Sequence, residues 1–145
     1  MDRVAEPVLI EGGHYTDARG TLTYNNTFDA APVRRIYFVE NASPETVRAW
    51  QAHQTEQRWF TAITGSFTIK LVKIDHWESP ARDLKQLSFT LTAGDFTVLH
   101  VPGGYASSIQ ATQPHSTLMA MGDYLMGAIQ DEYRFAPDYF LTVIN

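Results

Sequence analysis

Residues 47–60 read VRAWQAHQTEQRWF, and with the Gly65-Ser66 turn that follows they predict three successive β-strands. Side chains alternate between the two faces of a strand. This alternation predicts one face with Val47, Ala49, Gln51 and His53, and the opposite face with Arg48, Trp50 and Ala52. In the next strand, Arg58 and Phe60 share a face. The stretch therefore gathers an imidazole, an amide, a guanidinium and several aromatic rings in a short length of chain.

The rest of the chain repeats this pattern of short strands, separated by Gly and Pro corners. Further strands are predicted near residues 7–11, 21–24, 33–40, 67–72, 86–92, 96–101, 107–110 and 116–124, with a final strand or a docked terminus at 136–145. No long stretch has helical periodicity. We therefore predict an all-β, cupin-type jelly-roll β-barrel that occupies residues 1–145 as a single domain.

Composition narrows the class of protein. The chain has 145 residues, a net charge of −5 and no cysteine. The acidic balance argues against a general binder of nucleic acid or of anionic membranes, and the lack of cysteine removes disulfides and thiolate metal sites. Met1–Glu6 lacks the apolar core of a signal peptide, and no apolar run approaches the ~20 residues that span a bilayer. We expect a cytoplasmic protein without nucleic-acid or membrane partners.

The chain offers few of the ligands that metal-binding cupins use. Their usual set takes two His and a Glu around the first strand pair, and a further His after a Pro-x-Gly corner. Here His53 has Glu56 nearby, but Gln51 and Ser107 occupy the positions where further histidines would fall. This set is too small for a three- or four-ligand site. We therefore expect no metal and no cofactor.

His53 is the candidate proton acceptor, because an imidazole titrates close to physiological pH. A purely structural role for His53 remains open at this stage. Arginines suit phosphate or carboxylate groups, which the guanidinium fork binds in pairs of hydrogen bonds. The arginine candidates are Arg19, Arg34, Arg35, Arg48 and Arg58, and the rings that could stack on a base or sugar are Trp50, Trp59, Tyr24 and Tyr105.

Six sequence blocks point to a family. They are DARGTL at 17–22, RIY at 35–37, VRAWQAHQ at 47–54, EQRWF at 56–60, GSF at 65–67 and LHVPGGYA at 99–106. Their order and spacing resemble the WxcM-like sugar-nucleotide cupins over nearly the whole chain. These proteins are similar to dTDP-4-keto-6-deoxyglucose 3,4-ketoisomerases and, more distantly, to dTDP-4-dehydrorhamnose 3,5-epimerases.

The resemblance implies a homodimeric jelly roll that binds a dTDP-linked 4-keto sugar without a metal. The Arg-Gly-x-His-x-His block of the ketoisomerases falls with its Arg on Arg48, its first His on Gln51 and its second on His53. In the 3,5-epimerases the catalytic His occupies the Gln51 position, and the catalytic Tyr falls on Met119. The resemblance therefore favours a ketoisomerase-like activity over 3,5-epimerisation.

The chemistry of such a reaction gives the candidate residues their roles. His53 is expected to remove a proton beside the ketone, and Gln51 or Arg48 to stabilise the developing enolate oxygen. Strict alternation places Arg48 on the other face unless a bulge intervenes. Arg58 is expected to contact the diphosphate, with Arg19 of the partner subunit as a further candidate. The remaining substrate-binding candidates are Arg35, Tyr37, Trp50, Phe60 and Tyr105.

Two alternatives come from different functional classes. Gln51, where the ketoisomerases have a histidine, favours a cupin that binds a sugar nucleotide without catalysis. A metal-dependent cupin enzyme is the other alternative, and the missing ligands argue against it.

Overall fold

The structure is a computed structural model that describes residues 5–141, and these residues form strands and loops. They contain no helix long and apolar enough to cross a membrane. The strands are β1 (Val8–Ile10), β2 (Gly13–Asp17), β3 (Gly20–Tyr24), β4 (Arg35–Val39), β5 (Val47–His53), β6 (Arg58–Thr64), β7 (Ser66–Lys73), β8 (Gln86–Thr92), β9 (Val98–Val101), β10 (Tyr105–Ala111), β11 (Thr117–Gly122) and β12 (Tyr133–Arg134).

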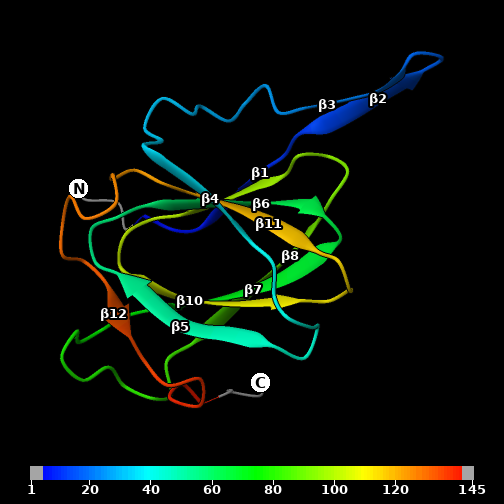
Figure 1. The fold of residues 1–145 in the computed structure, drawn as a ribbon. Helices are drawn as coiled ribbons and strands as arrows, with labels where there is room; N and C mark the ends of the chain where they lie inside the picture. The colour runs from blue at the N-terminus through cyan, green and yellow to red at the C-terminus, as the bar shows by residue number, and fades with distance from the viewer. Residues whose placement is uncertain (1–4, 142–145) are drawn as a thin grey trace.

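The strands of residues 5–141 form two five-stranded antiparallel sheets, which face each other in Figure 1. One sheet has the order β1-β9-β6-β11-β4, and the other has the order β12-β5-β10-β7-β8. The hairpin of β2 and β3 forms a third, two-stranded sheet that projects away from the barrel (Figure 1). The prediction of an all-β barrel of short antiparallel strands is therefore confirmed.

The core lies between the two large sheets, because both turn one apolar face inward. On β7 the inward side chains are Phe67, Ile69 and Leu71, all fully buried. Phe60 on β6 and Leu99 on β9 meet them from the opposite sheet. Each such side chain stabilises the fold by about 1.5–3 kcal/mol through burial.

Strand β5 departs from the strict alternation that its sequence predicts. Its pairing with β10 shifts register, so that Ser107 lies opposite Gln51 whereas Ile109 lies opposite Arg48. Three steps along β5 thus match two steps along β10, which is the pattern of a β-bulge. As a result Arg48 reaches the side on which Gln51 and His53 lie, which strict alternation does not predict, and Ala49 borders that side while also packing against the outer cluster of Trp50 and Ala52.

The C-terminal segment packs on the outer face of β5. Residues 136–141 form turns and bends rather than a strand, and Phe140 is buried edge-on against Trp50, with ring centroids 5.1 Å apart. The docked terminus predicted for this segment is thus present up to Leu141, and the remainder, 142–145, lies outside the described residues.

Candidate functional site

A cavity of about 540 Å³ opens between β4 of one sheet and β5 of the other. Its volume falls in the range of small-molecule sites in proteins. The cavity-lining residues that carry polar or charged side chains are Arg35, Tyr37, Arg48, Gln51, His53, Arg58, Ser107, Glu132 and Arg134. Four arginines in one cavity make it suitable for an anionic ligand.

The bulge in β5 brings Arg48 to this cavity. Because three residues of β5 match two of β10 at this point, Arg48 lines the same cavity as Gln51 and His53, which Ala49 and Trp50 also border. Its Nε donates a hydrogen bond to Oδ1 of Asn41 at 2.8 Å, and the side chain is otherwise exposed. The bulge is therefore what places a cation beside the two polar groups.

His53 is buried in the cavity wall as a neutral imidazole. Burial, reinforced by the positive charge of Arg58, lowers the pKa of His53 to about 4, although the carboxylates of Asp131 and Glu132 oppose the shift. Its Nδ1 lies 3.1 Å from Oε2 of Glu56, while its Nε2 has no hydrogen-bond partner among residues 5–141. A carboxylate near Nδ1 favours a proton on that nitrogen, which leaves a lone pair on Nε2.

Arg58 is the buried cation that connects the groups of the site. Its Nη2 lies 3.2 Å from Oε2 of Glu56, so one carboxylate oxygen serves both Arg58 and His53. Its Nη1 donates to the Tyr37 hydroxyl at 2.6 Å and, at 3.4 Å, to Oε1 of Gln51. Arg58 is 6% exposed, and such burial of a charge requires partners of this kind.

Two further arginines of the cavity have fewer side-chain partners than Arg58. Arg35 lies over the Tyr37 ring, 4.6 Å from its centroid, and Arg48 bonds only to the neutral side chain of Asn41. Neither arginine forms an ion pair with a carboxylate within the described part of the chain. Their charges therefore remain free to meet a ligand that enters the cavity.

The segment that ends in β12 closes the site, and the sequence analysis missed it. Nε2 of Gln51 donates to Oε1 of Glu132 at 2.8 Å. Next to it, the buried carboxylate of Asp131 accepts the backbone N–H groups of residues 54, 55 and 56 at 2.9, 2.8 and 2.7 Å. These bonds fix the turn between β5 and β6, which carries Glu56 to its place beside His53.

A second aspartate holds the other side of the same turn. Oδ1 of Asp123 accepts the backbone N–H of Gln57 at 2.8 Å, and Oδ2 lies 3.3 Å from Nε2 of that residue. Asp123 and Asp131 are thus the two anchors of a loop, residues 124–130, that borders the site. Nothing in the sequence of this loop has a strand or helix period, which is why no element or site was predicted there.

Two of the predicted substrate-binding residues lie away from this cavity, and a third only borders it. Phe60 is fully buried in the core, two residues deeper in the barrel than Arg58. Arg19 lies on the β2–β3 hairpin, where Asp17 pairs with it. The ring of Trp50 borders the cavity but packs on the outer face of the sheet, where its Nε1 lies 3.3 Å from the carbonyl oxygen of Pro137.

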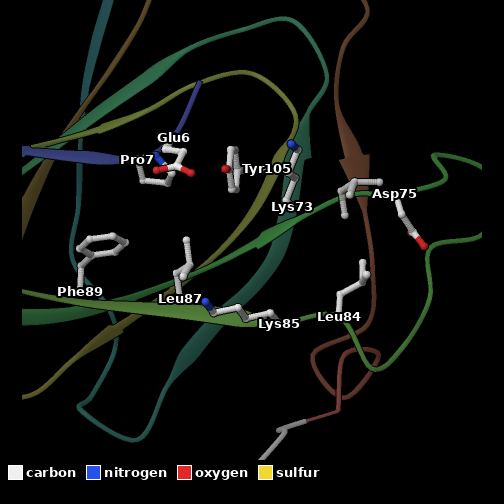
Figure 2. Close-up of a pocket in the computed structure, with 10 residues that line it drawn as sticks. Glu6, Pro7, Lys73, Asp75, Leu84, Lys85, Leu87, Phe89 and Tyr105 are labelled. Atoms are coloured by element: carbon white, nitrogen blue, oxygen red, sulfur yellow. The ribbon is translucent and has the colours of Figure 1, made fainter. Parts of the chain in front are cut away.

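Tyr105 lines a different cavity, of about 690 Å³, which Figure 2 shows. In this view Tyr105 lies between Lys73 and the Glu6-Pro7 segment, above Leu87 and Lys85. Burial, with the charge of Glu6, raises the pKa of Tyr105. Because Tyr105 pairs with His53 on one side and with Lys73 on the other, its strand separates the two cavities.

The described residues offer no cluster of three or more His, Asp or Glu side chains placed to hold a metal ion. The one carboxylate beside His53, that of Glu56, is engaged by both His53 and Arg58 within the described residues.

Comparison with known proteins gives neighbours by structure rather than by sequence. No protein-family model and no curated protein sequence matches the chain. A variant of the 3,4-ketoisomerase QdtA from Thermoanaerobacterium thermosaccharolyticum, solved with TDP-4-keto-6-deoxyglucose, is similar with a TM-score of 0.70 and 16% identity, over 92% of this chain and 90% of that one.

Two further structures extend this set. A 3,4-ketoisomerase from Helicobacter canadensis has a TM-score of 0.71 and 16% identity, over 90% of this chain and 91% of that one. The RmlC epimerase of Mycobacterium tuberculosis has a TM-score of 0.70 and 20% identity, over 90% of this chain and 69% of that one. At these identities the likeness shows a shared fold, and the neighbours are of the classes that the sequence resemblance indicated.

Proposed function

We propose that this protein is a sugar-nucleotide ketoisomerase that moves the ketone of a dTDP-linked 4-keto-6-deoxy sugar from C4 to C3. His53 removes the proton from C3, and the electron pair of that C–H bond forms an enediolate with the C4 oxygen. The C4 oxygen gains a proton as the C3 hydroxyl loses one, and the proton held by His53 then returns to C4, which gives the 3-keto sugar. Neither step needs an oxidant or a metal.

The observation that carries the proposal is the state of His53. Its imidazole is neutral at pH 7, and its Nε2 has a lone pair with no partner among the described residues. A base in that state can accept a proton without first losing one. A positioned base of this kind contributes about 10²–10⁴ in rate.

The cations of the cavity fit the rest of the substrate. Arg35 and Arg48 lack carboxylate partners in residues 5–141, so they, rather than the fully engaged Arg58, are suited to the diphosphate. Arg58 and the Tyr37 hydroxyl lie next to Gln51, where donors can stabilise the enediolate oxygen. The structural neighbour solved with TDP-4-keto-6-deoxyglucose supports this choice of substrate class.

A second candidate function is favoured by one specific observation. The amide of Gln51 is already bonded to Glu132 and Arg58. That amide stands where the ketoisomerases have a histidine and cannot carry a proton, so if the reaction needs both histidines, the protein binds the sugar nucleotide without isomerising it. A homodimer in the cytoplasm remains our prediction for either function, and light scattering of the purified protein tests the dimer.

Proton NMR in D₂O with dTDP-4-keto-6-deoxyglucose tests the proposal directly. We expect deuterium to enter the sugar ring beside the ketone as the 3-keto product appears. His53→Asn should slow this exchange by about 10²–10⁴, while the control His76→Asn, on an exposed loop, should not.

Other outcomes assign other functions. Exchange at C5 as well would revive epimerisation. Line broadening without exchange would support the binding protein. Neither exchange nor binding would exclude this class of substrate.

A further inference from the structure

The amide of Gln51 has a fixed polarity across the cavity. Its Nε2 donates to Oε1 of Glu132 at 2.8 Å, and its Oε1 lies 3.4 Å from Nη1 of Arg58. An ionised carboxylate can only accept hydrogen bonds and a guanidinium can only donate them. The reverse orientation of the amide would place oxygen against oxygen and N–H against N–H.

Glu132 keeps this position although its side chain is 47% exposed, because the backbone on both sides of it is held. Before it, Asp131 is 8% exposed and accepts three backbone N–H groups of the β5–β6 turn. After it, β12 pairs with β5, so that Tyr133 lies opposite Ala52 and Arg134 lies opposite Gln51. The Glu132 carboxylate is therefore delivered to Gln51 by anchored backbone rather than by a free surface side chain.

We propose that Glu132 is a positioning residue that sets the amide orientation of Gln51 in the cavity. The proposal rests on the proposed function, in which Gln51 stabilises the enediolate oxygen. One N–H of Nε2 goes to Glu132, and the second N–H remains to donate to that oxygen. Without Glu132 only the 3.4 Å contact of Oε1 with Arg58 holds the amide, so it can turn and present its carbonyl to the developing negative charge instead.

Two variants of Glu132 separate positioning from folding. Glu132→Ala removes the acceptor, whereas Glu132→Gln keeps an acceptor oxygen that can be presented to Gln51. We expect kcat to fall by about tenfold to a hundredfold in Glu132→Ala, with KM changed by less than about threefold, and most of kcat to return in Glu132→Gln. Glu78→Ala, which removes an exposed glutamate from the loop between β7 and β8, is the matched control and should leave kcat unchanged.

A second measurement reads the amide itself and needs no turnover. In a nitrogen–proton correlation spectrum, the side-chain NH₂ signals of Gln51 are identified by their loss in Gln51→Glu. We expect one of the two protons to exchange slowly with water in the wild type and in Glu78→Ala, and both to exchange rapidly in Glu132→Ala.

The kinetic and the NMR measurements together distinguish failure of the positioning role from failure of the proposed function. Unchanged Gln51 signals together with unchanged kcat in Glu132→Ala would overturn the positioning role. A wild-type protein without any isomerase activity would overturn the proposed function instead, while the exchange of the Gln51 protons would still decide whether Glu132 orients the amide. A Glu132→Ala variant that lowers the unfolding midpoint and is not rescued by Glu132→Gln would show a structural role and overturn the proposal.

Discussion

Two arginine–carboxylate pairs of this protein have the same sequence spacing and opposite surroundings. Asp17 and Arg19 lie on the projecting hairpin, with Nη2 2.7 Å from Oδ2 and the arginine side chain 88% exposed. Glu56 and Arg58 lie in the barrel, with Nη2 3.2 Å from Oε2 and the two side chains 9% and 7% exposed. The shorter contact is the less consequential one, because water screens it. The burial of the two side chains, rather than the distance between their charged atoms, therefore decides what each pair contributes.

The hairpin pair affects only the pKa values of its own two groups. Its hydrogen bonds lower the pKa of Asp17 and raise that of Arg19, and neither group connects to the cavity. The barrel pair also holds His53, Tyr37 and Gln51. An arginine paired with a carboxylate two residues earlier therefore serves turn geometry in one place and the candidate site in the other.

The largest expected effect comes from breaking the buried pair. Arg58→Met leaves the Glu56 carboxylate buried without its cation, and we expect the free energy of unfolding to fall by about 3–5 kcal/mol. Urea unfolding at pH 7 measures this loss. Glu56→Gln combined with Arg58→Met should recover most of it, because no uncompensated charge then remains. A loss below about 1 kcal/mol in the single variant would mean that water reaches Glu56 and that the contrast with the hairpin is weaker than the structure indicates.

A smaller effect comes from protonating the buried histidine beside that pair. An unfolded histidine binds its proton near pH 6.5 and the folded His53 only near pH 4, so the unfolded state holds more protons between these values. Stability should therefore decrease as pH falls, by about 2 kcal/mol from pH 7 to pH 5 on account of His53. Urea unfolding of the wild type and of His53→Asn at both pH values isolates this contribution, since the other titrating groups are common to both. Equal losses in the two proteins would contradict a depressed pKa for His53.

The same pKa predicts the pH dependence of the proposed reaction. Because His53 stays unprotonated down to about pH 4, kcat/KM should not fall as pH decreases through 6.5. An acidic limb near pH 6.5 that disappears in His53→Gln would show that the imidazole is more solvated than the structure has it.

The smallest effect is expected on the hairpin. Arg19→Ala removes an exposed, screened pair, so the urea midpoint should stay within experimental error of the wild type. Its isomerase rate tests a separate point, since the sequence resemblance assigned Arg19 of the partner subunit to the diphosphate. A raised KM with unchanged stability would support that role across a dimer, whereas an unchanged KM would confine Arg19 to the turn.

Local patterns in the sequence predicted the barrel, because alternation and Gly or Pro corners are encoded within each strand and turn. The eighth strand, for example, coincides with the predicted residues 86–92. The side on which Arg48 lies could not be derived in this way, since the bulge arises from the pairing of β5 with β10, about sixty residues later. The resemblance nevertheless identified Arg48 as a site residue, and the structure brings it to the cavity with His53 and Gln51.

The positions of two predicted site residues away from this cavity have equally physical causes. Phe60 shares a face with Arg58, but that face runs from the cavity into the core, so two residues along the strand separate a polar site from a dry interior. Tyr105 follows a corner that resembles the family, yet its central strand turns it toward a second cavity. Asp131 and Glu132 act through backbone N–H groups and one amide, and such bonds leave no pattern in the sequence around them.

Two aspartates flank residues 124–130, so the sequence of this loop can change while its ends stay attached. Asp123 and Asp131 fasten its ends to the backbone of residues 54–57, so this attachment does not depend on what lies between them, while Met126 of the loop lines the cavity. Each doubling of the loop length raises the free energy of loop closure by only about 0.6 kcal/mol. Exposed side chains of this loop, Leu125, Met126 and Ile129, border the opening. Evolution or a designer can therefore exchange the loop to suit a different ligand while the anchored framework of the candidate site is kept.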